Sequence, residues 1–317
     1  MIELTNWAEA RGWKVAWGPL SVLEQVRSDI ERLSASGEID RQFEQQELRV
    51  FEFPPAEKAG AHAARVLVLA VPRPAHTITF ELENGALETL APPTYVHYSR
   101  LPESVRQLLL ADVFPAETRL EPLAVPLKAL AARLGLVRYG LNNLSYISGM
   151  GSYFQLVGYR TDGDLPLPAG WSPAQPQALP ECEACGLCRS ACPAAAIRSE
   201  KFLLRADLCL TLFTENAGDC PQDRLPAGHR CLVGCLECQE TCPHNAGLLR
   251  IEPSGVVFDR EETQALLAGG PVKDVLACRI RSKLERLALA HYEPVLARNL
   301  ANVLAVRRRH AHVLGSP

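Results

Sequence analysis

Apolar positions recur at the spacing of an α-helix in five stretches of the chain. The first stretch follows Ser21, which together with Glu24 has the form of a capping box. Gly135 is expected to end another helix as its C′ residue. The predicted helices cover residues 22–33, 102–111, 126–134, 277–290 and 295–306.

Strand patterns lie in the first half of the chain. Residues 65–71 form a β-rich apolar run closed by Pro72, which predicts a buried strand. Residues 76–82 alternate polar and apolar, as a half-exposed strand does, and Asn84-Gly85 then offers a tight turn. A further strand is predicted at 154–159. Interspersed with the helices, these strands predict a mixed α/β domain, of class α+β or α/β, over residues 1–162.

A proline-rich stretch follows this domain. Five prolines lie between Gly163 and Glu181, and this density excludes a helix or a central strand there. We therefore divide the chain into an α/β domain (1–162), a linker (163–180), a cysteine-rich module (181–250) and a short C-terminal helical region (251–317).

The composition is that of a globular protein. Hydrophobic residues make up 47% of the 317 residues and charged residues 22%, and the net charge is −3. The longest strongly apolar run, at 66–71, is far shorter than the ~20 residues that span a bilayer, and the first residues lack the pattern of a secretory signal. We expect a cytoplasmic protein without a membrane partner. Positive charge is concentrated in residues 273–312.

Cysteine is distributed unevenly. There are eleven cysteines and none precedes Cys182. An odd number crowded into one third of an intracellular chain indicates metal ligation rather than disulfides. The spacing Cys182-x-x-Cys185-x-x-Cys188-x-x-x-Cys192-Pro193 matches the bacterial ferredoxin run, in which the fourth cysteine ligates the other cluster of a pair.

A second, incomplete run supplies the remaining ligands. It is Cys235-x-x-Cys238-x-x-x-Cys242-Pro243, and Cys209 stands alone before it. Zinc is the alternative, but it does not explain a Cys-Pro pair after both runs. Cys220, Cys231 and Cys278 are expected to be thiols without a role. The spacing assigns Cys182, Cys185, Cys188 and Cys242 to one [4Fe-4S] cluster, and Cys192, Cys209, Cys235 and Cys238 to a second.

Two clusters imply electron transfer, but a plain ferredoxin does not need a 162-residue companion domain. A further bound redox group is therefore expected. Four segments of the chain resemble the cobalamin-dependent epoxyqueuosine reductases, which are relatives of the reductive dehalogenases. The segments are Leu134–Asn143, Gly151–Asp162, Cys209–Glu215 and Cys235–Asn245.

The resemblance implies a base-off cobalamin between the α/β domain and the cluster module, with electrons passing from the clusters to cobalt and on to substrate. Gly158 and two other glycines would let the backbone approach the macrocycle. The alternative is local turn chemistry, which also favours Asn and Gly. The implied cobalamin-binding residues are Gly140, Asn142, Asn143, Gly151, Ser152 and Tyr153.

The resemblance also points to catalytic residues. Glu121 stands where the family carries a proposed proton-donating Asp, and Tyr98 falls in a region that is tyrosine-rich in the family. An ordinary helix-start charge and a packed tyrosine are the alternatives. The chain departs from the family pattern in lacking a Glu-Arg pair after Glu121 and in carrying Leu141 in place of a lysine.

The C-terminal region corresponds to helical repeats that help family members bind tRNA. Only residues 284–306 match, with Leu296–Asn299 resembling one repeat element, and the run Arg307–His310 is either a phosphate contact or a solvated tail. Two functions are thus predicted. The first is a cobalamin- and iron–sulfur-dependent reductase of queuosine biosynthesis, acting on tRNA or a smaller substrate and supplied by a ferredoxin- or flavodoxin-type donor. The alternative is an electron-transfer or corrinoid-activating protein with no organic substrate.

Overall fold

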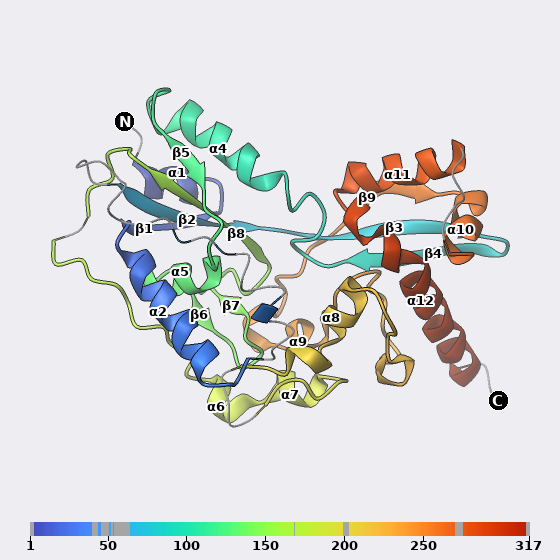
Figure 1. Cartoon of the computed structure of the whole chain (residues 1–317). Coiled ribbons are helices and arrows are strands. Elements are labelled where there is room, and N and C mark those ends of the chain that lie inside the picture. The colour runs from blue at the N-terminus through green and yellow to red at the C-terminus, as the bar shows by residue number, and fades with distance from the viewer. Residues whose placement is uncertain are drawn as a thin grey trace. The chain divides into compact units, whose positions relative to one another are not determined.

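The computed structural model describes residues 3–39, 44–45, 51, 53, 64–167, 169–198, 203–269 and 275–314. The chain forms two compact units, and each is built from separated stretches (Figure 1). Unit 1 comprises Met1–Pro72, Arg100–Gly186 and Arg198–Leu204. Unit 2 comprises Arg73–Ser99, Leu187–Ile197 and Arg205–Pro317. The units therefore interleave along the sequence, whereas the sequence patterns suggested consecutive domains.

Unit 1 is built on a four-stranded antiparallel sheet. Its strand order is β1-β2-β8-β5, and β2 pairs with β8 along its whole length. Both faces of β2 are buried, which explains its continuous apolar sequence. The strands are β1 (Lys14–Pro19), β2 (Arg65–Pro72), β5 (Leu120–Pro122) and β8 (Phe154–Thr161).

Helices cover both faces of this sheet. Side chains of α1 and α4 pack with Leu67 and Leu69, and those of α2 and α5 pack with Val66 and Val68 from the opposite face. The remaining elements of unit 1 are a two-stranded sheet and a one-turn helix. The elements are α1 (Leu4–Glu9), α2 (Val22–Ala35), α4 (Leu101–Asp112), α5 (Leu127–Arg133), β6 (Arg138–Tyr139), β7 (Ser145–Tyr146) and α6 (Cys182–Cys185).

A buried ion pair joins α2 to α5 in unit 1. The Arg133 Nε and Nη2 atoms donate to the two carboxylate oxygens of Asp29, at 2.7 and 2.6 Å. The capping box predicted at Ser21 is wrong, because Ser21 already has helical dihedral angles and its side chain caps no backbone N–H. Gly135 does follow α5 in the left-handed conformation, with φ of 75°.

Unit 2 contains a three-stranded sheet of order β4-β3-β9. Strands β3 (Ala75–Leu82) and β4 (Gly85–Ala91) form the hairpin expected at Asn84-Gly85. Strand β9 (Ile251–Phe258) pairs in parallel with β3. We predicted only helices after residue 250. Strand β9 lies at the sheet edge, is largely exposed and contains Pro253 and Gly255, so its sequence lacks a strand pattern.

Three helices pack against this sheet. They are α10 (Arg260–Leu267), α11 (Val275–Leu287) and α12 (Glu293–Leu314), and their apolar side chains surround the stacked rings of Phe80 and Phe258, whose centroids lie 4.9 Å apart. The short helices of unit 2 are α7 (Leu187–Ala191), η3 (Ala206–Leu208), α8 (Leu210–Glu215), η4 (Gln222–Arg224), α9 (Glu237–Glu240), η5 (Pro243–Asn245) and η6 (Ala290–Tyr292).

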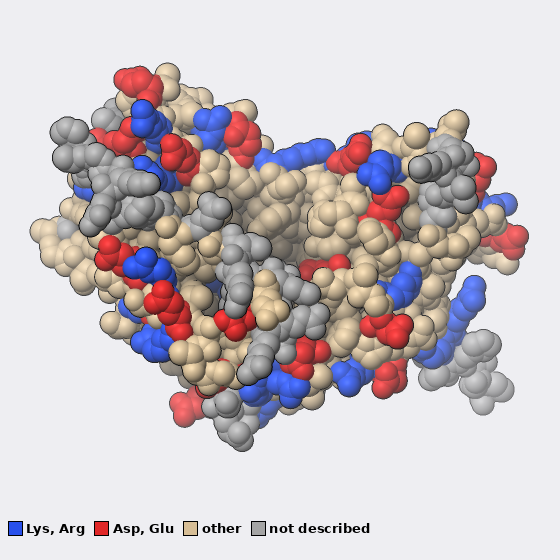
Figure 2. Space-filling model, viewed as in Figure 1, with Lys and Arg blue, Asp and Glu red and all other residues tan. Residues whose placement is uncertain are grey.

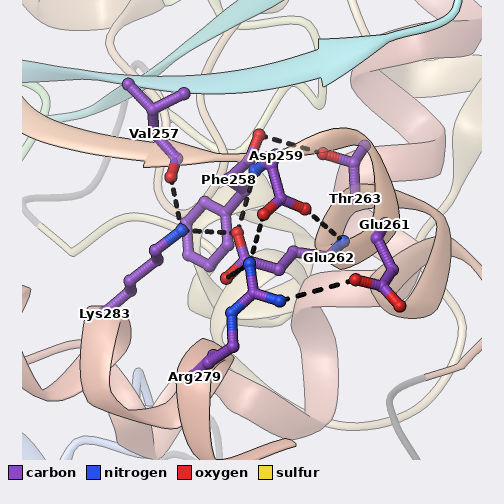
Figure 3. A network of polar contacts seen from close by, with 8 residues as sticks. All are labelled: Val257, Phe258, Asp259, Glu261, Glu262, Thr263, Arg279 and Lys283. Atoms are coloured by element: carbon purple, nitrogen blue, oxygen red, sulfur yellow. Dashed lines mark hydrogen bonds and ion pairs between the residues drawn. The ribbon is translucent and has the colours of Figure 1, made fainter. Parts of the chain in front are cut away.

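A buried carboxylate ties α10 and α11 to β9 (Figure 3). Glu262 is fully buried, and its side chain accepts a hydrogen bond from the backbone N–H of Asp259 in a capping box. Lys283 donates both to Glu262 and to the Val257 carbonyl, and Arg279 pairs with Asp259 and Glu262. The network holds three elements together.

The predicted helices and strands agree with the structure in type and place. Residues 163–180 carry no helix and no strand in their described part, as the prolines predicted, and Pro168 lies outside the described residues. None of the described helices is long and apolar enough to cross a membrane.

Candidate functional site

The eight predicted cluster ligands lie on short helices and the turns that follow them. Helix α6 carries Cys182 and Cys185 and ends at Gly186, which has a φ of 62°. Within unit 2, α7 carries Cys188, α9 carries Cys238, and these two helices pack against each other. The remaining ligands follow or precede such helices: Cys192, Cys209, Cys235 and Cys242.

Three thiols of the predicted second cluster lie close together. Burial, together with the nearby thiols of Cys209 and Cys192, raises the pKa of the Cys235 thiol to about 12. Burial likewise raises the pKa of Cys209, with a contribution from Cys192. Crowded, desolvated thiols are unfavourable as thiolates unless a metal compensates their charge. Cys192, Cys209 and Cys235 are therefore arranged as ligands of one group.

Backbone N–H groups are turned toward these sulfur atoms. The Ala196 N–H donates to Cys192 Sγ at 3.3 Å, and the Glu237 N–H donates to the Cys235 sulfur. Cys209 occupies the N-cap of α8 and accepts from Thr211 and Leu212. Such hydrogen bonds stabilise the anionic sulfur of a bound cluster.

The ligands of an iron–sulfur cubane stand apart, since each thiolate binds its own iron atom. The described residues contain no group of three His, Cys, Asp or Glu side chains that could hold a metal ion. Of the other cysteines, Cys220 and Cys231 are buried and Cys278 is exposed.

Helix α8 is anchored at its C-terminal end by polar contacts that the sequence did not reveal. The Thr214 hydroxyl accepts a hydrogen bond from the N–H of Gly234 at 2.8 Å, and the Asn299 amide of α12 donates to the Thr214 carbonyl at 2.7 Å. Arg298 donates to the carbonyls of Phe213 and Asn216. The Arg298-Asn299 pair, which marked the repeat-like element, thus positions the helix that begins at Cys209.

The predicted cobalamin-binding segment, residues 140–153, lies in unit 1. Asn142 is buried, its amide donates to the Tyr146 hydroxyl at 2.9 Å, and its oxygen accepts from the Leu144 N–H at 3.3 Å. A Cβ atom on Gly140 would lie 2.5 Å from both Asn142 and Tyr146, and one on Gly158 would lie 2.4 Å from Leu127. The chain's own side chains therefore account for these two glycines and for Asn142.

Four further residues predicted to bind cobalamin lie in the same segment. Asn143 adopts a φ of 60°, and Lys128 donates to its carbonyl and to its side-chain oxygen, at 2.8 and 2.9 Å. Ser152 is half-buried and Tyr153 is buried, while Gly151 has a φ of 65° that favours glycine. The Ser145 hydroxyl is buried with no hydrogen-bond partner among the described residues. These groups fit a ligand rich in amides, such as a corrin.

The two candidate catalytic residues are exposed and belong to different units. Glu121 lies on the edge strand β5, where its backbone pairs with Arg160, and its side chain makes no hydrogen bond or ion pair within the described part of the chain. Tyr98 is 56% exposed, in the turn segment that follows β4. Each unit on its own thus leaves its candidate accessible from solvent.

The basic residues of the C-terminal helices are mostly engaged. Arg279 and Lys283 pair with Glu262, Arg281 pairs with Glu293 at 2.7 Å, and the Arg307 guanidinium donates to the Ala86 carbonyl. On the face drawn in Figure 2, basic and acidic side chains are interspersed. In α12, Arg308 and Arg309 are exposed and form no described pair, and the side chain of His310 lies outside the described residues.

Comparison with known proteins supports both the module and the fold. Residues 181–245 match the family model described as a 4Fe-4S double cluster binding domain. The chain is similar to the epoxyqueuosine reductase of Staphylococcus aureus, with 29% identity over 135 residues, which are 42% of this chain and 33% of that protein. The matched part spans about a third of the length of the curated relatives, all of which are epoxyqueuosine reductases.

The structural similarity extends over the chain. The structure of epoxyqueuosine reductase from Streptococcus thermophilus gives a TM-score of 0.60 at 19% identity, covering 98% of this chain and 82% of that chain. A crystal structure of epoxyqueuosine reductase with an epoxyqueuosine-modified tRNA-Tyr stem loop gives 0.58 at 17% identity, covering 95% and 80%. The resemblance inferred from the motifs is confirmed: the chain has the mixed α/β fold of the epoxyqueuosine reductase structures, and its residues 181–245 match a 4Fe-4S double cluster binding domain.

Proposed function

We propose that this protein is an oxidoreductase of the epoxyqueuosine reductase type, which takes electrons from an external ferredoxin or flavodoxin through two [4Fe-4S] clusters. The observation that carries the proposal is the gathering of Cys192, Cys209 and Cys235 within a segment that matches a double-cluster domain. The buried thiols supply the ligands, and the backbone N–H groups around them stabilise the anionic sulfur.

Base-off cobalamin is the cofactor proposed for unit 1, where it would supply the low-valent metal that reduces the substrate. Asn143, Ser145 and Ser152 are the groups of segment 140–153 that would hold it by hydrogen bonds to its amides. The left-handed backbone at Asn143 and Gly151 would shape that contact. Glu121 is the proposed proton donor and Tyr98 the second candidate. Because the Glu121 carboxylate is exposed, its use as an acid would require substrate or cofactor to cover it.

The proposed substrate is an epoxyqueuosine-containing tRNA, in keeping with the relative whose structure holds such a stem loop. A specific observation favours the alternative, an electron-transfer or corrinoid-activating protein without an organic substrate. Most of the basic side chains of α11 and α12 are engaged within unit 2, so fewer of them are left to contact tRNA phosphates.

One set of measurements on the anaerobically purified protein tests the proposal. We expect iron and sulfide contents of two four-iron clusters per chain, and a base-off absorption spectrum when cobalamin is titrated at tens of micromolar. We then expect reductant-dependent conversion of an epoxyqueuosine stem loop, abolished in Glu121→Gln while clusters and corrinoid stay bound. Clusters with cobalamin but no conversion would favour the corrinoid-activating protein. Clusters without cobalamin binding would favour an electron carrier, and robust turnover by Glu121→Gln would remove that residue from the mechanism.

A further inference from the structure

A half-buried tyrosine–carboxylate pair lies beside two segments that carry ligands of the predicted second cluster and has no part in the scheme above. The Tyr95 hydroxyl donates a hydrogen bond to Glu215 Oε1, and all the residues involved belong to unit 2. Burial and the adjacent carboxylate raise the pKa of Tyr95 well above its usual value, so the hydroxyl stays protonated as the donor. The ring of Tyr292 supports the Tyr95 ring, with centroids 5.9 Å apart.

The pair touches two of the three chain segments that carry ligands of that cluster. Glu215 is the last residue of α8, the helix that begins directly after Cys209. On the other side, a Cβ atom at Gly234, the residue before Cys235, would lie 2.6 Å from the Tyr95 hydroxyl oxygen. The Thr214 hydroxyl joins the same two segments through the Gly234 N–H. Tyr95 is therefore wedged between the Cys235 loop and the end of the Cys209 helix.

This arrangement places the Glu215 carboxylate beside the two segments that carry Cys209 and Cys235, without making it a ligand of the cluster. Net charge near a cluster and hydrogen bonds around its sulfurs are two of the factors that set its reduction potential. A negative charge acts over several ångströms where water is excluded, and it disfavours the added electron. The Tyr95 hydroxyl donates to one oxygen of this half-buried carboxylate and so helps to hold it in place.

We infer that Glu215 lowers the reduction potential of the cluster held by Cys209 and Cys235, and that Tyr95 acts as a positioning residue for Glu215. The inference rests on the proposed double-cluster function and adds to it a determinant of the direction of electron flow. A cluster with a lowered potential passes its electron on more readily to the next acceptor.

Potentiometric titration of the anaerobic protein, followed by electron paramagnetic resonance, tests the inference. The two midpoints are assigned with Cys235→Ser, which removes one of them. We expect Glu215→Gln to shift the Cys235-dependent midpoint to a more positive potential, and more than it shifts the other midpoint. Tyr95→Phe should shift the same midpoint when introduced alone and have little effect in the Glu215→Gln background, because Tyr95 acts only through Glu215.

Tyr98→Phe is the matched control on the same turn segment. Tyr98 is 56% exposed, and neither midpoint should move in this variant. Unchanged midpoints in both Glu215→Gln and Tyr95→Phe would overturn the inference, and so would loss of cluster iron in Tyr95→Phe, which would make the pair purely structural. If the unsubstituted protein assembles no cluster that depends on Cys235, the proposed function fails first, and the iron content distinguishes the two failures.

Discussion

Two regions of this protein were expected to bind cofactors, and they treat their polar side chains in opposite ways. In unit 2, Cys192, Cys209 and Cys235 crowd one another, and burial raises the pKa values of the last two. In segment 140–153 of unit 1, Asn142 is satisfied on both sides by its own chain. A side chain left in an unfavourable state by its own fold is available to a ligand, whereas a satisfied one serves the fold. In unit 2, Arg279 and Lys283 are likewise satisfied by ion pairs, whereas Arg308 and Arg309 are exposed without a described pair.

The largest effect is expected from removing one of the predicted cluster ligands. Cys242→Ser should remove the cluster built on the Cys182 run, which lies fifty or more residues earlier, because the spacing assigns Cys242 to that cluster. Iron content should fall by about half, and the cluster that depends on Cys235 should stay. Cys278→Ser, at an exposed thiol, is the control and should lose no iron. If Cys242→Ser instead damages the Cys235 cluster, the crossed assignment is wrong.

The next effect concerns a satisfied group of unit 2. Glu262→Gln should destabilise the protein by about 2–4 kcal/mol, because it leaves Lys283 and Arg279 beside a neutral side chain in a buried network. Chemical denaturation measures the change. Glu261→Gln removes only an exposed contact to the same Arg279 and should alter stability by about 0.5 kcal/mol or less. Equal losses in the two variants would contradict the assignment of Glu262 to the core of the network.

A buried histidine of unit 2 should make the stability of the protein depend on pH. Burial lowers the pKa of His229 to about 4, so the folded state holds the ring neutral. The unfolded chain binds a proton near pH 6.5, and stability should therefore fall as the pH drops from about 6.5 to 4, by up to about 3 kcal/mol, and be fully present above pH 6.5. Denaturation midpoints measured across this range should flatten in His229→Gln. A wild-type curve with no slope in this window would rule out a neutral buried His229.

Two neighbouring asparagines of unit 1 should differ in what they contribute, Asn142 to stability and Asn143 to cobalamin binding. Asn142→Ala should cost about 1–3 kcal/mol, because it removes the hydrogen bonds to the buried Tyr146 hydroxyl and from the Leu144 N–H. Asn143→Gly keeps the left-handed backbone and the carbonyl that accepts from Lys128, so stability should change little. Cobalamin affinity should nevertheless weaken in Asn143→Gly. Unchanged affinity there would remove Asn143 from the proposed corrin contacts.

The sequence predicted five helices, the strands β2, β3 and β8, and the ligand spacing, because these depend on local periodicity and on neighbouring cysteines. It did not predict β1 or α10, nor the parallel pairing of β9 with β3, since that contact joins residues about 175 positions apart and β9 is a largely exposed edge strand. For the same reason the roles of Tyr95, Thr214 and Asn299 around α8 were missed. Glu215 belongs to the family-like segment Cys209–Glu215, but its partner Tyr95 lies 120 residues away in the sequence.

The smallest expected effect concerns tRNA and the cations of the C-terminal helices. Arg308 and Arg309 are exposed without a described pair, so they are the groups of this region available to phosphate. Replacing both with alanine should weaken binding of a tRNA stem loop severalfold at low salt and reduce the slope of log K against log salt by about 1–2, the value expected for one or two lost phosphate contacts. Arg279→Ala should leave that affinity unchanged and instead lower stability, because this arginine is already paired with Asp259 and Glu262. If Arg279→Ala weakens binding as much as the double substitution, the paired cations are exchanged for phosphate on binding, and a satisfied group is then no longer a reliable sign of a structural role. No binding at low salt by the unsubstituted protein would move the proposed substrate from tRNA to a small molecule.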